Sequence, residues 1–280
     1  MRIGIVGTES SHVDQFVDLL NIKGAGGGAR VVALSGGASE RNEVLRARGA
    51  VEHVVGGPGE MVGLVDAVVV ADRDGGLHRE HAVPFLAAGL PVLVDKPLAR
   101  TVADAEAIVA AARAYGAPLT SYSALRLLPA TDALVAEAAG LGAAQVVVAS
   151  GPADPEGPYG GVFFYGIHPV DVALRLAPGP LGDVRVERCA DTVTATAVAG
   201  ATRVVVNLVR PTATAQVPFH VLVVAREGVA QRTLDLGADY LLPALTAFLA
   251  MARTGRPPVP YEDLLRPVRL LQEIDAALRG

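Results

Sequence analysis

The chain has 280 residues, of which 51% are hydrophobic and 19% charged, so it can build one large domain or two of ordinary size. Its net charge of −5, with no cluster of lysine and arginine, argues against nucleic acid or an anionic membrane as a partner. The single cysteine, Cys189, excludes an internal disulfide and is expected to be a buried neutral thiol. Without a signal peptide or an apolar run of membrane-spanning length, the protein is expected to be cytoplasmic.

The first twenty or so residues have the pattern of a strand, a turn and a helix. Ile3, Ile5 and Val6 form a short apolar run that suits a buried strand, and Gly7 ends it. Apolar residues at positions 13, 16, 17 and 20 then have the spacing of one helix face. In dinucleotide-binding folds, the turn of such a unit receives a pyrophosphate on free backbone N–H groups.

The turn departs from the three-glycine fingerprint of those folds. Glu9 stands in place of the second glycine, where the backbone approaches the pyrophosphate, and a carboxylate there repels phosphate unless it turns away. His12 stands in place of the third glycine, and we expect it to line the site or else to cap the helix. A plain strand, turn and helix without a nucleotide is therefore the alternative interpretation.

Strands and helices alternate through the rest of the first half of the chain. Strands are predicted at 30–34, 51–55, 66–71, 91–94 and 118–121, with helices at 39–47, 77–88 and 101–115. This alternation predicts an α/β domain over residues 1–122, in which helices cover both faces of a doubly wound, Rossmann-like parallel sheet.

Strands dominate the second half. They are predicted at 144–150, 192–197, 203–210, 217–226 and 229–234, with helices at 131–139, 167–176, 241–253 and 261–278. Residues 123–280 are therefore expected to form an α+β domain with a mainly antiparallel sheet. The alternation of Val204, Val206 and Leu208 with Val205, Asn207 and Val209 leaves both faces of this sheet apolar, which predicts a homodimer or homotetramer joined there.

Several segments together resemble the glucose–fructose oxidoreductase/inositol dehydrogenase (Gfo/Idh/MocA) family. These segments are Asp66–Ala71, Leu77-His78, Ala87–Gly89, Val92–Leu98 with its Asp95-Lys96-Pro97, Ser121-Tyr122, Arg126, Gly166–Asp171 and the closing stretch 255–280. The resemblance implies an NAD(P)-dependent oxidoreductase that acts on a sugar, a polyol or a related small alcohol or ketone. It places the family's lysine at Lys96 and the family's histidine at His168.

Two acidic residues of the family pattern are missing. The aspartate four residues before the histidine is replaced by Phe164, and the carboxylate that ends the second strand is replaced by Ser35. Because Ser35 does not repel a 2′-phosphate and Arg41 follows it, we expect a preference for NADP(H) over NAD(H). A relative that has lost redox activity and binds a metabolite or a partner protein, and a lyase or glycosidase that uses bound cofactor, remain as alternatives.

The resemblance and the spacing together give a set of candidate site residues. The expected cofactor-binding residues are Gly7, Thr8, Ser10, Ser11, His12, Ser35, Arg41, Ala71, His78, Asp95 and Lys96. The expected substrate-binding residues are Tyr122, Arg126, Tyr165 and His168. No metal site is expected, although His78 and His81 are helix neighbours.

Lys96, His168 and Asp171 are the expected catalytic residues. Lys96 follows the fifth strand and is expected to have a lowered pKa when it lies beside a nicotinamide. Asp171 lies three residues after His168 and would orient its imidazole; in the alternative, His168 only packs at the start of its helix. We expect Lys96 and His168 to converge on one pocket.

Overall fold

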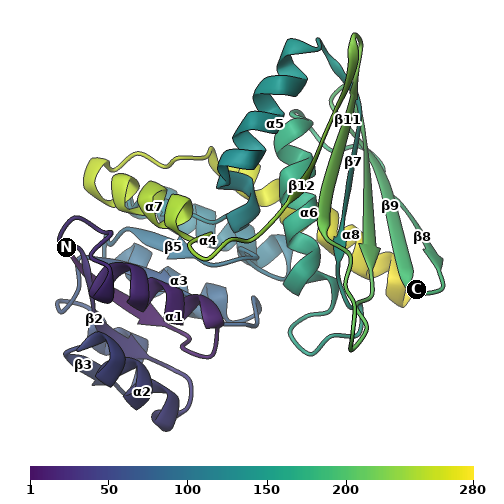
Figure 1. Ribbon diagram of the computed structural model, residues 1–280. Coiled ribbons are helices and arrows are strands. Elements are labelled where there is room, and N and C mark those ends of the chain that lie inside the picture. The colour runs from purple at the N-terminus through teal and green to yellow at the C-terminus, as the bar shows by residue number, and fades with distance from the viewer. The chain divides into compact units, whose positions relative to one another are not determined.

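In the computed structural model, which describes residues 1–280, the first six strands form one parallel sheet in the order β3-β2-β1-β4-β5-β6 (Figure 1). The strands are β1 (Arg2–Val6), β2 (Arg30–Ser35), β3 (His53–Val55), β4 (Ala67–Val70), β5 (Val92–Val94) and β6 (Leu119–Thr120). All four residues of β4 are fully buried, because parallel strands covered on both faces are apolar throughout. The predicted doubly wound sheet is confirmed.

The helices that connect these strands begin and end at recognisable local signals. They are α1 (Ser11–Val17), which continues as a π-helix (Asp18–Ile22), α2 (Ser39–Gly49), α3 (His78–Ala87) and α4 (Val102–Tyr115). The Thr101 hydroxyl accepts from the Asp104 N–H at the start of α4, and Gly116 closes this helix with a φ of 63°. A short 3-10 helix (Pro58–Met61) lies between β3 and β4.

The second sheet has the order β12-β11-β7-β10-β9-β8, and every pairing is antiparallel except that of β7 with β10. The strands are β7 (Ala144–Pro152), β8 (Arg185–Cys189), β9 (Thr192–Ala199), β10 (Thr202–Val209), β11 (Phe219–Ala225) and β12 (Gly228–Leu234). The mainly antiparallel sheet is therefore confirmed. The sequence did not predict β8, which pairs with β9 and carries Cys189; this thiol is exposed, which corrects the expectation that it is buried.

The helices of the second half are a 3-10 turn (Ala124–Leu127), α5 (Pro129–Gly140), α6 (Val162–Leu176), α7 (Leu242–Thr254) and α8 (Tyr261–Arg279). The helix predicted at 167–176 begins five residues earlier, at Val162, and contains Pro169 in its interior. The added first turn is apolar and buried at Val162 and Phe163, like most of the helix. These residues are therefore helical, although the sequence predicted that the helix begins only at 167.

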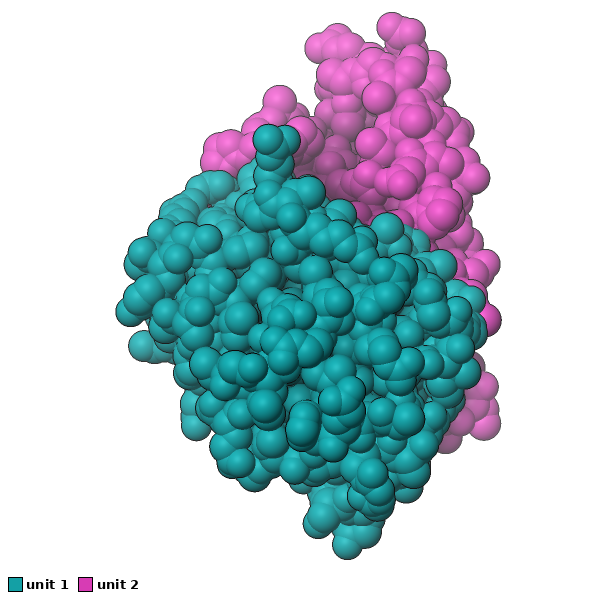
Figure 2. All heavy atoms as spheres, turned by 90° about the vertical axis from the view of Figure 1, so that its left-hand side faces the viewer, with its two compact units in different colours: residues 1–122, 239–264 teal, residues 123–238, 265–280 magenta.

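The chain divides into two units, of which the first comprises residues 1–122 and 239–264 and the second residues 123–238 and 265–280 (Figure 2). The segment 239–264 thus groups with the parallel sheet, whereas the sequence analysis placed it with residues 123–280. Polar contacts within unit 1 explain this grouping: the Tyr122 hydroxyl donates to the carbonyl of Ala244, and Arg253 donates to the carbonyl of Gly26.

Candidate functional site

The ends of β1, β2 and β4 meet at Gly7. Its φ is +81°, and a Cβ atom there would lie 2.5 Å from the backbone nitrogen of Asp72. The Gly7 N–H donates to the carbonyl of Ser35 at 3.0 Å, while the Ala71 N–H donates to that of Val6 at 2.7 Å. Glycine is required here for its positive φ and for this close approach. The site thus forms where the strand order reverses between β1 and β4, the position at which open α/β sheets bind ligands.

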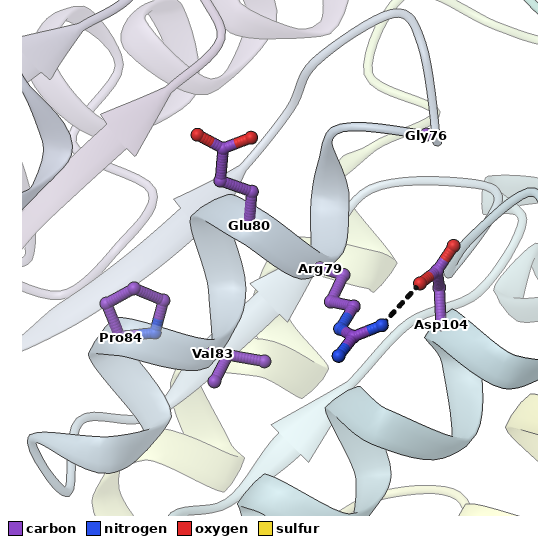
Figure 3. A pocket seen from close by; sticks show the side chains of 6 residues that line it. All are labelled: Gly76, Arg79, Glu80, Val83, Pro84 and Asp104. Atoms are coloured by element: carbon purple, nitrogen blue, oxygen red, sulfur yellow. Dashed lines mark hydrogen bonds and ion pairs between the residues drawn. The ribbon is translucent and has the colours of Figure 1, made fainter.

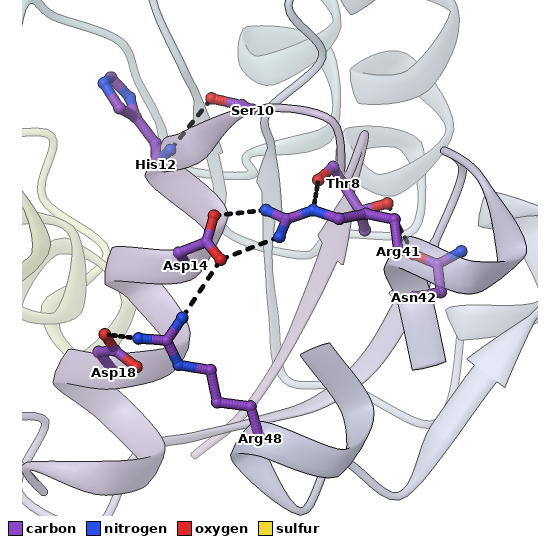
Figure 4. A network of polar contacts seen from close by, with 8 residues as sticks. All are labelled: Thr8, Ser10, His12, Asp14, Asp18, Arg41, Asn42 and Arg48. Atoms are coloured by element: carbon purple, nitrogen blue, oxygen red, sulfur yellow. Dashed lines mark hydrogen bonds and ion pairs between the residues drawn. The ribbon is translucent and has the colours of Figure 1, made fainter. Parts of the chain in front are cut away.

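The residues after Gly7 are fixed by polar contacts to α1 and α2 (Figure 4). The Thr8 hydroxyl is buried and bonds the carbonyl of Gly36 and the side chain of Asn42. The Ser10 hydroxyl caps α1 by accepting from the His12 N–H at 3.2 Å. The carbonyl of Ser10 also accepts from the Val13 N–H at 3.1 Å, so this residue provides partners for two of the first N–H groups of α1.

Arg41 stabilises this turn through hydrogen bonds to Thr8 and Asp14. Its Nε donates to the carbonyl of Thr8, and its two terminal nitrogens both donate to the carboxylate of Asp14 (Figure 4). Arg48 also reaches Asp14 and pairs with Asp18. The positive charge of Arg41, which the sequence analysis assigned to a 2′-phosphate, is therefore matched by a carboxylate within the protein.

The structure supports the fit of a dinucleotide to this turn in two ways. Ser35 is fully buried at the end of β2, and its hydroxyl has no hydrogen-bond partner, as expected of a group that awaits a ligand or water. The Glu9 carboxylate reaches across to the loop after β2, where it accepts a hydrogen bond from the Ala38 N–H at 2.8 Å. The condition set by the sequence, that this carboxylate turn away, is met.

A buried charged cluster follows β5. His12 Nδ1 lies 2.8 Å from the Asp95 carboxylate, and both side chains are 10% exposed. The ring of His12 also makes an edge contact with Tyr240, with 5.8 Å between centroids. Although burial opposes ionisation, His12 and the neighbouring Lys96 lower the pKa of Asp95 to about 2. His12 thus acts in the site as the partner of Asp95.

Lys96 is 6% exposed beside this carboxylate. Burial lowers the pKa of its amine to about 8, with a further contribution from the positive charge of Arg73, while Asp95 opposes the shift. The lowered pKa that the sequence analysis expected is thus present without a nicotinamide. An amine with a pKa near 8 exists in both protonation states around neutral pH, as a proton acceptor or donor must.

His78 connects the loops that follow β4 and β5. One ring nitrogen lies 2.8 Å from the carbonyl of Pro97, and the other lies 3.0 Å from the carbonyl of Asp72. His81 contacts the carboxylate of Asp72 at 2.8 Å, and this hydrogen bond raises the pKa of His81. The sequence analysis did not single out Asp72; the spacing of His78 and His81 on one helix face was the only signal that they share a target.

A separate polar cluster lies in unit 2 and connects Ser123 with α6. The Ser123 hydroxyl lies 2.7 Å from His168 Nδ1, and the Ser123 N–H donates to the Asp171 carboxylate at 2.8 Å. Asp171 also accepts from the Arg126 guanidinium at 2.7 Å. His168 Nδ1 therefore contacts Ser123, and Ser123 in turn links the histidine to the Asp171 carboxylate.

Aromatic rings surround this histidine. Its ring is 3% exposed in the structure and lies 5.3 Å from that of Phe219 and 6.0 Å from that of Tyr165. Phe164, which replaces the family's aspartate, packs 5.2 Å from Tyr159 and 4.9 Å from Tyr165. Lys96 belongs to unit 1 and His168 to unit 2, so their convergence stays a prediction.

Two surface hollows lie in unit 1 and contain none of the expected site residues. One, of about 340 Å³, lies beside α3 and the start of α4 and is bordered by Arg79, which pairs with Asp104 at 3.0 Å (Figure 3). The other, of about 550 Å³, runs along α2 from Ser39 to Ala47. No group of three or more metal-ligating side chains lies together, and no helix is both long and apolar enough to cross a membrane.

Comparison with known protein families finds a match for the first part of the chain. Residues 1–123 match the Gfo/Idh/MocA family model, described as an oxidoreductase family with an NAD-binding Rossmann fold. This part of the chain is similar to that family. The resemblance seen in the sequence is thereby confirmed, and the Gly7 turn described above lies within the matched residues.

The curated relatives match over the same part of the chain. Inositol 2-dehydrogenase of Acidiphilium cryptum is 37% identical over 129 residues, which cover 45% of this chain and 37% of that protein. The 1,5-anhydro-D-fructose reductase of Ensifer adhaerens is 37% identical over 106 residues, which cover 35% of this chain and 30% of that protein. The chain thus matches about a third of the length of these relatives.

Solved structures match over nearly the whole chain. The apo scyllo-inositol dehydrogenase of Lactobacillus casei has a TM-score of 0.85 at 16% identity, covering 99% of this chain and 95% of that one. A probable dehydrogenase of Thermotoga maritima has a TM-score of 0.82 at 18% identity, covering 99% and 97%. At such identities the likeness concerns the fold, and it extends to both units.

Proposed function

We propose that the protein is an NAD(P)-dependent oxidoreductase that transfers hydride between the nicotinamide and a hydroxyl or keto carbon of a sugar, polyol or related small molecule. The observation that carries this proposal is the buried amine of Lys96, whose pKa is about 8, at the carboxyl end of a strand in an NAD-binding fold. A bound nicotinamide supplies the hydride chemistry, and the protein manages the proton.

The residues divide this work between binding and proton transfer. Gly7, Thr8 and Ser10 form the turn that would hold the cofactor, and Ser35 lies at the neighbouring strand end. Lys96 accepts the proton of the substrate hydroxyl in oxidation and returns it in reduction. Asp95, fixed by His12, keeps a negative charge beside the amine and limits the fall in its pKa.

His168, Tyr122, Arg126 and Tyr165 remain the proposed substrate-side residues. The Ser123 hydroxyl contacts His168 through Nδ1 and so fixes the orientation of its ring. Arg126 holds the Asp171 carboxylate, so its role in substrate binding would be indirect. The Tyr122 hydroxyl is engaged by Ala244, and we assign it a positioning role.

The nature of the substrate and of the assembly follows from separate observations. The names of the relatives, inositol 2-dehydrogenase and 1,5-anhydro-D-fructose reductase, favour a cyclic polyol or a sugar-like ketone. A second copy of the chain is the proposed partner, as a homodimer or homotetramer joined through the outer face of the second sheet. We propose that the protein acts in the cytoplasm, where its one exposed thiol would stay reduced.

A redox-inactive relative that binds a small metabolite or a partner protein is the second candidate. The aromatic packing of Phe164 favours it, because a phenyl ring cannot supply the carboxylate that the family places there. A lyase or glycosidase that uses bound cofactor transiently is a further form of this candidate.

The test combines binding with turnover. Thermal unfolding and NADH or NADPH fluorescence measure cofactor binding, and absorbance at 340 nm follows turnover with a panel of inositols, monosaccharides and 1,5-anhydro-D-fructose. We expect binding and at least one turnover that is lost in Lys96→Met but kept in the surface control Lys23→Met. Binding without turnover on any substrate would favour the second candidate, and absence of dinucleotide binding would overturn the proposal.

A further inference from the structure

The carboxylate of Glu9 lies beside the loop that follows β2, the strand that ends in an acidic side chain in many dinucleotide-binding folds. It leaves the β1–α1 turn and accepts from the N–H of Ala38, three residues beyond the end of β2. A Cβ atom on Gly37 would lie 2.2 Å from the Thr8 hydroxyl and 3.0 Å from Glu9 Oε1, so the two loops are in close contact. Only glycine at 37 permits this approach.

The end of β2 itself has no carboxylate. Ser35 is its last residue, followed by Gly36 and Gly37 with φ of +76° and +74°. In dinucleotide-binding folds an acidic residue here binds the hydroxyls of the adenosine ribose, and a basic residue accommodates the 2′-phosphate of NADP. The buried, unpartnered hydroxyl of Ser35 adds a second polar group at the same strand end.

The positive charge of Arg41 is already matched within the protein and is not free to offset a 2′-phosphate at this position. Arg41 lies in the first turn of α2, and Asp14 and the carbonyl of Thr8 engage all three of its guanidinium nitrogens. Glu40 adds a further acidic side chain in the first turn of α2. The local charge therefore opposes a phosphate and suits a neutral diol.

We infer that Glu9 binds the adenosine ribose hydroxyls in place of the missing strand-end carboxylate and sets a preference for NAD(H) over NADP(H). One carboxylate oxygen stays on the N–H of Ala38, and the other accepts from the ribose diol. This inference rests on the proposed dinucleotide-dependent function. It reverses the preference expected from the sequence, because that expectation relied on a free Arg41.

Binding of each cofactor to three forms of the protein tests this inference. NAD⁺ and NADP⁺ are titrated by calorimetry against the wild type, Glu9→Gln and the control Glu40→Gln, at fixed ionic strength. Glutamine at 9 keeps an oxygen acceptor for the Ala38 N–H while it removes the charge. Thermal unfolding without cofactor checks that both variants fold as the wild type does.

We expect the wild type to bind NAD⁺ at least about tenfold more tightly than NADP⁺, since hydrogen bonds to a charged group are the stronger ones. Glu9→Gln should weaken NAD⁺ binding about tenfold and strengthen NADP⁺ binding, while Glu40→Gln keeps the wild-type ratio. Tighter NADP⁺ binding by the wild type, or an equal change of ratio in both variants, would overturn the inference and leave the proposed function standing. Failure of every form to bind either dinucleotide would overturn both.

Discussion

The amine of Lys96 and the Asp95–His12 pair are adjacent at the end of β5, and their ionisation is coupled through a buried environment. Burial disfavours the charge of Asp95 and that of Lys96, but the two charges have opposite signs and each offsets part of this effect on the other. The outcome is a lysine whose pKa is about 8 and an aspartate whose pKa is about 2. Two residue-level predictions follow from these values.

Oxidation of an alcohol substrate should accelerate with pH until about pH 8 and then level, because only the neutral amine of Lys96 accepts the proton. Lys96→Met should lose about 10²–10⁴-fold in kcat and this dependence on pH, with cofactor affinity changed far less. Steady-state rates between pH 6 and 10 measure this. A flat profile in the wild type would show that another group takes the proton.

His12→Ala should lower the free energy of unfolding at pH 7 by about 3 kcal/mol, because it leaves the Asp95 carboxylate buried without its partner. The folded-state pKa of Asp95 is depressed to about 2, so the stability that the charge contributes is complete above about pH 4 and lost as pH falls through 2. The difference between wild type and variant should therefore shrink in acid.

Urea unfolding at pH 7, 5 and 3 measures this difference. The double variant with Asp95→Asn should cost less than the sum of the two single variants. Additive costs at pH 7 would mean that the two side chains do not interact.

At the scale of elements, Gly7 lies at the centre of a set of contacts. These contacts join the ends of β1, β2 and β4 and the starts of α1 and α2. The Gly7 N–H bonds the end of β2, and its missing Cβ lets the loop after β4 approach. Arg41 and Asn42 of α2 both bond the turn or its neighbours. We therefore expect a substitution in this turn to disturb the packing of all five elements.

Gly7→Ala should be far more destabilising than Gly24→Ala. Both glycines have positive φ, +81° and +65°, but a Cβ on Gly24 meets no heavy atom within 4 Å. Gly24→Ala should cost about 1–2 kcal/mol for backbone conformation alone, and Gly7→Ala about 2 kcal/mol more for overpacking against Asp72. Thermal unfolding of both variants compares them, and equal losses would contradict the predicted steric contact.

At the scale of the whole molecule, the second sheet presents two faces of different exposure. Val204, Val206 and Leu208 are buried on the face that contacts α6, and Val205 and Asn207 are half-buried on the other. The half-buried face also carries Val148 and Leu222, which are paired across β7 and β11. Figure 1 shows α5 and α6 on one side of this sheet. We propose that a second copy of the chain covers the other side of the sheet.

Leu222→Lys should convert the assembled protein into a monomer, because it puts a charge at the centre of this apolar face. Val44→Lys is the matched control, since Val44 is 60% exposed on α2 in the other unit. Light scattering at micromolar concentrations measures the mass of each form. A wild type that is already monomeric, or a Leu222→Lys variant that stays assembled, would contradict the prediction.

The sequence by itself determined the two sheets and the glycine turn and singled out Lys96 as a candidate, because strand and helix periodicity and the Asp-Lys-Pro segment are local signals. The tertiary structure decided where Glu9 points, that Arg41 is engaged by Asp14, that His12 pairs with Asp95 and that residues 239–264 group with the first unit. These facts depend on contacts between residues far apart in the chain. The spacing of residues within one segment does not reveal these contacts, because each contact depends on which strand ends lie next to one another in the fold.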